Sequence, residues 1–225
     1  MKKPLNDLSS VIEDILDSDL DRFRAAGLVA VDCEMTGLNP HRDLLALVQV
    51  SDREGFVRLV RRMDWPNARN LIALLADPQV IKIFHFAIMD CAFILTHLGV
   101  ETANPYCTKI ASKIGRTYTE EHSLAGLVKE FCGDELNKSE QTTFWLADQL
   151  SAKQLTYAAK DVLYLIELRD WLEKIIEKKG RLPTGITYEE LNHRCQAFIP
   201  NLVHLWLSGW DFGRENHTAA AIFGR

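Results

Sequence analysis

The sequence contains little cysteine, and its five cysteines include no CxxC pair. An odd number without that spacing argues against a disulfide framework or a zinc site and indicates reduced thiols. No apolar run approaches the length of a membrane span, and acids soon follow the two lysines at the N-terminus, which argues against a signal peptide. We therefore expect a soluble cytoplasmic protein.

Positive charge is not in excess either. The chain has 26 lysines and arginines against 31 aspartates and glutamates, which gives a formal net charge of −5. This balance argues against a protein that coats long nucleic acid by charge alone. It leaves open a short anionic ligand, or one that is bound through metal ions.

Linkers and internal repeats are also absent, so the sequence predicts one main domain. Apolar spacing predicts a helix over residues 8–24. Three extended segments follow at residues 27–33, 44–52 and 55–60. Breaker-rich stretches separate them, which is typical of a β-meander.

Helices alternate with a strand beyond this meander. The pattern predicts a helix that begins at residue 68 and stops before Pro78, a strand at 79–84 and a helix at 87–99. From Thr108 onward it is helical, with one long helix over residues 151–179. A meander followed by interleaved helices predicts an α/β domain.

Two acids occur where the first apolar run ends. In the segment VAVDCEMTGL, Asp32 and Glu34 lie one residue apart, and the pleat of a strand turns both side chains to one face. Acids are common where a strand runs out into solvent, so the pair alone is weak evidence for a site. If both face inward, they repel each other unless one is protonated or a cation lies between them. Mg²⁺ and Mn²⁺ prefer oxygen ligands, so further acids are expected nearby.

Two more acids are candidates for such a site. Asp161 lies four residues after Tyr157, which puts both on one face of a helix beside an apolar stripe. The plainer interpretation is a boundary aspartate that is hydrogen-bonded to the tyrosine. Asp90 is the only acid between Asp77 and Glu101 and lies in an apolar stretch. A lone acid there favours a functional role, although placement at the start of a helix also explains it.

The order and context of these acids resemble the DEDD superfamily of 3′→5′ exonucleases, and the Tyr-x3-Asp spacing resembles its tyrosine subtype, to which ribonuclease D belongs. The segment LNKSEQTTFWLADQLSAKQLTYAAKDVLYL resembles the ribonuclease D signature around the third motif. The segments GLNPHRDLLALVQVSD, KIFHFAIMD and RTYTEEHSLAGLVKEF, and the tail CQAFIPNLVHLWLSGW, are similar to the small nanoRNase C group. The resemblance covers roughly residues 28 to 212.

The resemblance implies a ribonuclease H-like (DnaQ-like) α/β fold, in which helices flank a mixed central sheet. We expect an N-terminal helical segment at residues 1–27 and an exonuclease domain at 28–180. A C-terminal helical extension at 181–225 would pack on the same domain. The chain length leaves no room for the nucleic-acid-binding domains of long ribonuclease D proteins, which favours the small branch.

The resemblance also implies a two-metal hydrolase that releases nucleoside 5′-monophosphates from a free 3′ end. Asp32, Glu34, Asp90 and Asp161 would hold two divalent cations, Mg²⁺ or Mn²⁺, with Asp32 shared between both. A phenol with an ordinary pKa near 10 is a poor base at neutral pH, so Tyr157 would orient the attacking water. The expected substrate is short RNA, down to dinucleotides. A homo-oligomer, either a dimer or a higher ring, is expected by analogy.

Seven residues near the motifs are candidates for substrate contacts, and each also has a structural explanation. They are Met35, Leu38, His85, Phe86, Lys138, Gln141 and Trp145. Lys138 is the candidate for a phosphate contact at the 5′ end of a dinucleotide. Base stacking at Phe86 would be sequence-tolerant.

Other activities stay open at this point. A ribonuclease D-type processor of longer RNA, such as tRNA precursors, would use the same acids, and so would a DNA-active exonuclease. Oligoribonuclease has a similar first motif, but that family has a histidine five residues before the last aspartate, where this chain has Thr156. A non-catalytic nucleic-acid-binding module normally lacks one of the acids, and all four are present here.

Overall fold

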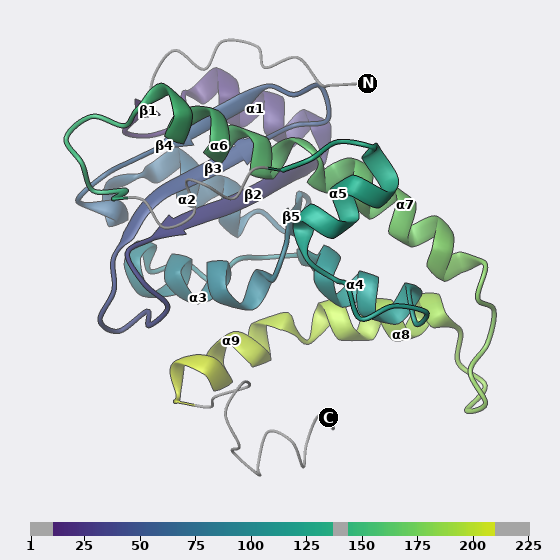
Figure 1. The fold of residues 1–225 in the computed structure, drawn as a ribbon. Helices are drawn as coiled ribbons and strands as arrows, with labels where there is room; N and C mark the ends of the chain where they lie inside the picture. The colour runs from purple at the N-terminus through teal and green to yellow at the C-terminus, as the bar shows by residue number, and fades with distance from the viewer. Residues whose placement is uncertain (1–10, 137–143, 210–225) are drawn as a thin grey trace.

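A mixed β-sheet with helices on both faces forms the body of the protein in this computed structural model (Figure 1). The structure describes residues 11–136 and 144–209. No helix in these two ranges is long and apolar enough to cross a membrane. The predicted α/β class with a mixed sheet is confirmed.

The sheet is built around the predicted meander. Its strands, in spatial order, are β1 (Val11–Ile12), β4 (Val57–Val60), β3 (Leu45–Ser51), β2 (Leu28–Met35), β5 (Ile81–Phe84) and β6 (Pro105–Cys107). β2, β3 and β4 pair antiparallel, whereas β5 joins β2 in parallel and β6 joins β5 in parallel. The central strand β2 therefore has an antiparallel neighbour on one side and a parallel neighbour on the other.

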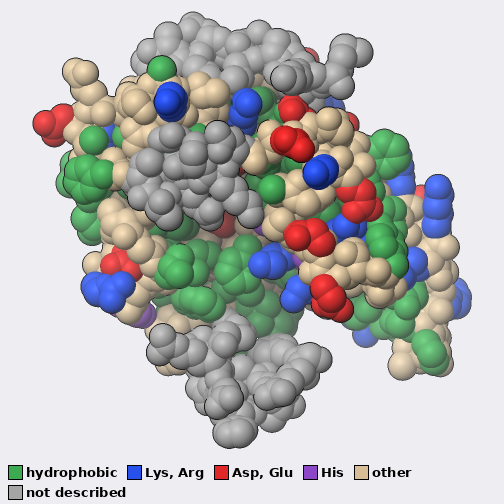
Figure 2. Space-filling view, viewed as in Figure 1, with side chains coloured by type: hydrophobic (Ala, Val, Ile, Leu, Met, Phe, Trp, Pro, Cys, Tyr) green, Lys and Arg blue, Asp and Glu red, His purple; other side chains and the backbone are tan. Residues whose placement is uncertain are grey.

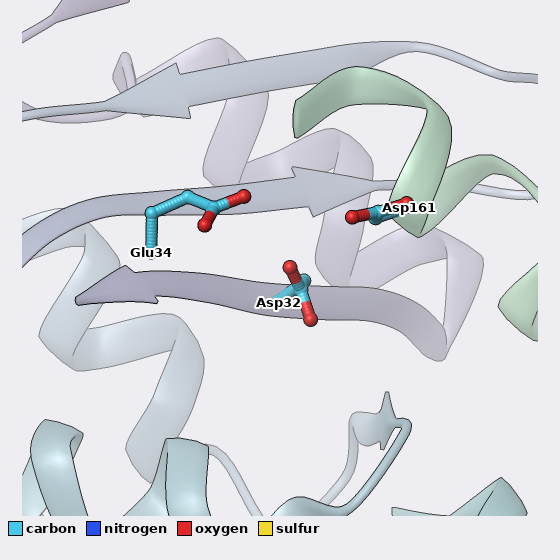
Figure 3. Close-up of side chains that lie close together, drawn as sticks. All are labelled: Asp32, Glu34 and Asp161. Atoms are coloured by element: carbon cyan, nitrogen blue, oxygen red, sulfur yellow. The ribbon is translucent and has the colours of Figure 1, made fainter. Parts of the chain in front are cut away.

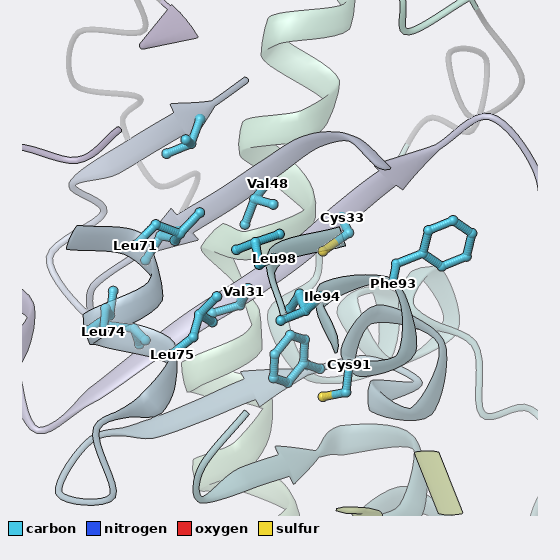
Figure 4. Close-up of a cluster of buried hydrophobic side chains, with 14 of the residues drawn as sticks. Val31, Cys33, Val48, Leu71, Leu74, Leu75, Cys91, Phe93, Ile94 and Leu98 are labelled. Carbon is cyan, nitrogen blue, oxygen red and sulfur yellow. The ribbon is translucent and has the colours of Figure 1, made fainter. Parts of the chain in front are cut away.

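One face of the sheet is covered by α1 (Asp17–Ala26), α2 (Arg69–Ala76) and α3 (Ala87–Leu98). Alternate residues of β2, Val31 and Cys33 among them, point into this layer and pack against Leu71, Phe93 and their neighbours (Figure 4). The last helix of the described residues, α9 (Ile199–Leu207), packs against α3 at the edge of the same layer. Burial of this continuous apolar cluster holds β2 and α3 together.

The opposite face is covered by α5 (Leu124–Cys132), α6 (Ala152–Leu163) and α7 (Leu165–Glu177). Ala30 of β2 and Ile83 of β5 point into this layer. α4 (Thr108–Gly115) packs against α7, and α8 (Tyr188–Ala197) packs against both. The residues of β2 that alternate with Val31 and Cys33 therefore face α6.

The helix predicted over residues 8–24 is only partly right. α1 begins at Asp17, and the β-branched residues Val11 and Ile12 pair in parallel with β4 at the edge of the sheet. Asp19 fixes the start of α1, because its carboxylate accepts a hydrogen bond from the backbone N–H of Leu16. Residues before 11 lie outside the described ranges.

The single long helix predicted over residues 151–179 is wrong, because two helices occupy this span. α6 ends and α7 begins at Tyr164. The hydroxyl of Tyr164 donates a hydrogen bond to Asp134, which ties the break to the chain after α5. The break allows α6 to lie over β2, β3 and β4 while α7 lies over β2 and β5. The short strand β6 was not predicted either.

Candidate active site

Three carboxylates converge at the α6 face of β2. The strand continues beyond Cys33 to Met35, so Asp32 and Glu34 lie within it and share the face that Asp161 of α6 approaches (Figure 3). Ligand oxygens of the three side chains all lie within 4.8 Å of one another. Glu34 is only 7% exposed, whereas Asp32 is partly open to solvent. The strand thus carries its acids inward rather than out into water.

Asp90 lies beside these three carboxylates without belonging to the same close group. It lies in the first turn of α3 and is 4% exposed. Its carboxylate accepts hydrogen bonds from the backbone N–H and the thiol of Cys33. Its charge nevertheless contributes to raising the pKa values of Asp32 and Glu34. The fourth predicted acid is therefore part of the same electrostatic cluster.

An unusual backbone conformation leads into the helix that carries Asp90. Phe86 has a φ of 73°, in the left-handed region that residues other than glycine seldom adopt. It is the residue at which the chain turns from β5 into α3. Strained conformations of this kind are concentrated at functional sites, and this one places Asp90 next to β2.

Burial raises the pKa values of all four acids, and repulsion by neighbouring acids raises those of Asp32 and Glu34 further. Burial is the first cause in each case, and it raises the pKa of Glu34 to about 9, of Asp90 to about 8 and of Asp161 to about 7. The pKa of Asp32 is also raised, first by burial and then by Asp90, Asp161 and Glu34. The cluster is thus unfavourable as a set of bare anions. It is stabilised either by protons or by a cation of high charge.

Tyr157 lies one helical turn before Asp161 and donates its hydroxyl to that carboxylate. Burial, followed by the charge of Asp161, raises the pKa of Tyr157 above its ordinary value. The phenol is therefore a hydrogen-bond donor at neutral pH and not a base. Its ring packs beside the indole of Trp145, with 6.1 Å between the centroids.

The donor set fits a hard divalent cation. Carboxylate oxygens are the ligands that Mg²⁺ and Mn²⁺ prefer, and three of them already lie close enough to share one ion. A cation would replace the protons that burial otherwise imposes on these groups. The carboxylates of Asp32, Glu34 and Asp161 are the residues that would hold it, with Asp90 next to them.

The residues predicted to contact substrate fall into different environments. Leu38 is 73% exposed, whereas Met35 is partly buried against the apolar cluster under α3. Trp145 is 2% exposed and packs under Tyr157, so it presents almost no surface to a ligand. Lys138 and Gln141 lie outside the described residues. The substrate roles of all these residues stay predictions.

His85 and Phe86 connect the end of β5 to the start of α3. Nδ1 of His85 is 2.9 Å from Oγ1 of Thr108, and burial lowers the pKa of His85 to about 3, so the ring is neutral. Nζ of Lys109 lies 4.6 Å from the centre of the Phe86 ring. Figure 2 shows apolar side chains gathered around the region of α3 and α4, with lysine or arginine beside them.

Two residues that contact the acids were not predicted from the sequence. Gln49 of β3 donates from Nε2 to Oε1 of Glu34 at 3.3 Å, and Cys33 donates to Asp90. The one available signal for Gln49 was a polar side chain in the middle of the apolar run LALVQVS. Cys33 stands between two acids, and an apolar or small residue there is expected in any strand.

Comparison with known proteins defines the class. A family model described as 3′-5′ exonuclease matches residues 6–177, which is well over half of the chain. The chain belongs to this 3′-5′ exonuclease family.

Two curated relatives are similar to most of the chain. Ribonuclease D of Escherichia coli (strain K12) is 31% identical over 77% of this chain and 46% of its own length. Exosome complex exonuclease RRP6 of Saccharomyces cerevisiae is 29% identical over 81% of this chain and 25% of its own length. The chain thus spans less than half the length of these curated relatives.

A solved structure matches more completely. Brucella melitensis NrnC has 36% sequence identity and a TM-score of 0.80, over 92% of this chain and 100% of that chain. Further structures of the same protein contain bound Mg²⁺ or are bound to pGG. These matches confirm the resemblance to ribonuclease D and the nanoRNase C group, and they confirm the ribonuclease H-like fold.

The raised pKa values predict how stability depends on pH in a chelating buffer. The folded pKa values, about 7 for Asp161 and about 9 for Glu34, lie above the unfolded values near 4. At any pH between the unfolded and folded values, the folded state therefore binds more protons than the unfolded state. This contribution to stability is complete below about pH 4 and is lost as pH rises through about 7 to 9. Urea unfolding in chelator should therefore show a free energy that falls from about pH 5 to about pH 9. A free energy that rises across this window would contradict the assignment.

Proposed function

We propose that the protein is a metal-dependent 3′→5′ exoribonuclease that degrades short RNA, down to dinucleotides, to nucleoside 5′-monophosphates. The observation that carries the proposal is the convergence of Asp32, Glu34 and Asp161 within 4.8 Å on the α6 face of β2. Membership of the 3′-5′ exonuclease family supports the reaction, because hydrolysis of a phosphodiester from its 3′ end is the activity that the family's name states.

Four acids would divide the work of holding two divalent cations, Mg²⁺ or Mn²⁺. Asp32 shares one face of β2 with Glu34 and approaches Asp161 of α6. Asp32 would contact both ions, Glu34 and Asp161 would complete one site, and Asp90 would support the other. Bound divalent cations supply a polarised phosphodiester and an acidified water at neutral pH. The raised pKa values of the acids mean that binding the cations also displaces protons from this chain.

Tyr157 would orient the attacking water. Its hydroxyl is held by Asp161, and its raised pKa keeps it protonated, so it can donate or share a hydrogen bond but not remove a proton. Its contact with Trp145 restricts the ring, and the start of α6 is fixed by the Ser151 cap. Tyr157 would therefore act by positioning the attacking water.

Short RNA is the substrate class best supported. The NrnC structure, which matches the chain at 36% identity across its whole length, belongs to a protein that also has a structure bound to pGG. Leu38 and Phe86 would offer apolar surface to bases, and Lys109 beside Phe86 would offer a positive charge to phosphate. A homo-oligomer, as a dimer or ring, is proposed by analogy with the nanoRNase C group.

Ribonuclease D-type processing of longer RNA is the second candidate. The observation in its favour is the 31% identity with E. coli ribonuclease D. The division of the chain at residues 27 and 180 into a leading segment, an exonuclease domain and a helical extension is proposed for either activity.

Removal of one acid should abolish hydrolysis without unfolding the protein. Asp161→Asn or Asp32→Ala should lower the release of mononucleotides at least about a hundredfold, because the cation loses a ligand, and excess chelator should do the same. Asp170→Asn, on α7 and paired with Arg53 at the surface, is the matched control and should retain activity. Mononucleotide release is measured by chromatography, and folding by circular dichroism. Full turnover by Asp161→Asn would refute the metal mechanism.

A length series decides between the two candidate activities. A two-nucleotide RNA should have a higher kcat/KM than an RNA of about twenty nucleotides at equal concentration, because the site is proposed to accept short ends. The matching two-nucleotide DNA in the same assay reports the sugar preference. Faster cleavage of the long RNA would move the assignment to the ribonuclease D-type activity.

A further inference from the structure

Gln49 is a fully buried polar residue in an otherwise apolar strand, and it lies at the proposed metal site. β3 is buried along its whole length, and Gln49 is 0% exposed. In the β2–β3 ladder Gln49 is the direct partner of Asp32, so its side chain stands on the same face as Asp32 and Glu34. Most buried side-chain polar atoms have at least one hydrogen-bond partner, so a buried amide atom without one needs an explanation.

Only the nitrogen of this amide has a hydrogen-bond partner among the described residues. Nε2 donates to Oε1 of Glu34 at 3.3 Å, across the diagonal of the ladder. Oε1 of Gln49 has no hydrogen-bond partner among the described residues, although it is buried. The unpartnered oxygen lies on the face where the three carboxylates converge. An O–H group that enters the site with the cation or the substrate would satisfy this acceptor.

The chemistry of the side chain fits this location. A glutamate would add a fifth acid to a cluster in which repulsion already raises the pKa values, and an apolar side chain would leave Glu34 without this donor. An asparagine would be one methylene too short to reach diagonally from the position opposite Asp32. A neutral amide on a long side chain donates to Glu34 and still offers an acceptor to the site.

We infer that Gln49 is a positioning residue: it holds the carboxylate of Glu34 in the orientation that binds the divalent cation, and its free oxygen accepts a hydrogen bond in the loaded site. The inference rests on the proposed function, since Glu34 must be a metal ligand. Partners that orient a ligating carboxylate typically change metal affinity by about 10- to 100-fold when removed.

The test is Mn²⁺ binding to the protein without substrate, followed by electron paramagnetic resonance or calorimetry. Gln49→Met keeps the volume of the side chain but removes both hydrogen-bonding ends, and it should weaken Mn²⁺ binding about tenfold or more. Gln49→Asn should weaken it in the same direction. The activity of Gln49→Met should recover as Mn²⁺ is raised, because the ligands themselves are intact.

A matched control separates positioning from stability. Gln196 of α8 is also buried and bonds to the backbone of Cys107, far from the acids in the sequence and on another element. Gln196→Met should lower the free energy of unfolding and leave the Mn²⁺ affinity unchanged. Affinity within about twofold of the parent protein in Gln49→Met, or an equal loss in both variants, would overturn the inference.

The same titration keeps this inference distinct from the proposed function. Asp161→Asn should lose Mn²⁺ binding if the acids form the metal site. If Asp161→Asn binds Mn²⁺ as tightly as the parent, the proposed function fails. If Asp161→Asn loses binding while Gln49→Met retains it, only the role of Gln49 fails.

Discussion

The structure depends on one electrostatic constraint, which is that four acids lie together at β2, three of them buried and Asp32 only partly open to solvent. Taking a carboxylate out of water is costly, and like charges nearby add to that cost. In this chain burial raises the pKa values of Asp32, Glu34, Asp90 and Asp161, and the neighbouring charges raise those of Asp32 and Glu34 further. Such a cluster persists only where a proton or a cation stabilises it. The presence of this cluster in a well-packed sheet is the strongest indication that the site binds a cation.

The alternation of a single strand builds most of this arrangement. Asp32 and Glu34 face α6, where Asp161 and Tyr157 meet them, whereas Cys33 between them faces the other layer and holds Asp90 of α3. Both helical layers therefore contact the same short segment of β2, residues 32–34. The break at Tyr164 contributes as well, because it allows α6 to cross the strands that carry the acids while α7 packs over β5.

Local patterns in the sequence predict the parts of this arrangement that depend on spacing along the chain. The meander from β2 to β4, the helix that carries Asp90 and the Tyr157–Asp161 pair all follow from such spacing. The break between α6 and α7, the edge strand at Val11–Ile12 and the contact of Gln49 with Glu34 do not, because each depends on a partner distant in sequence: Asp134, β4 and β2. Local periodicity carries no information about such partners. The convergence of the four acids also joins distant parts of the chain. It was predicted through the resemblance to a family, which rests on the order of these acids, and not through their spacing.

The claim that buried acids exchange protons for a divalent cation is tested most directly by calorimetric titration with Mn²⁺ near pH 7, in buffers of different ionisation enthalpy. Since the pKa of Glu34 is raised to about 9 and that of Asp90 to about 8, these groups hold protons at that pH without a cation. The binding enthalpy should vary with the buffer, corresponding to release of about one proton or more per site. The same enthalpy in every buffer, with Mn²⁺ bound, would contradict it.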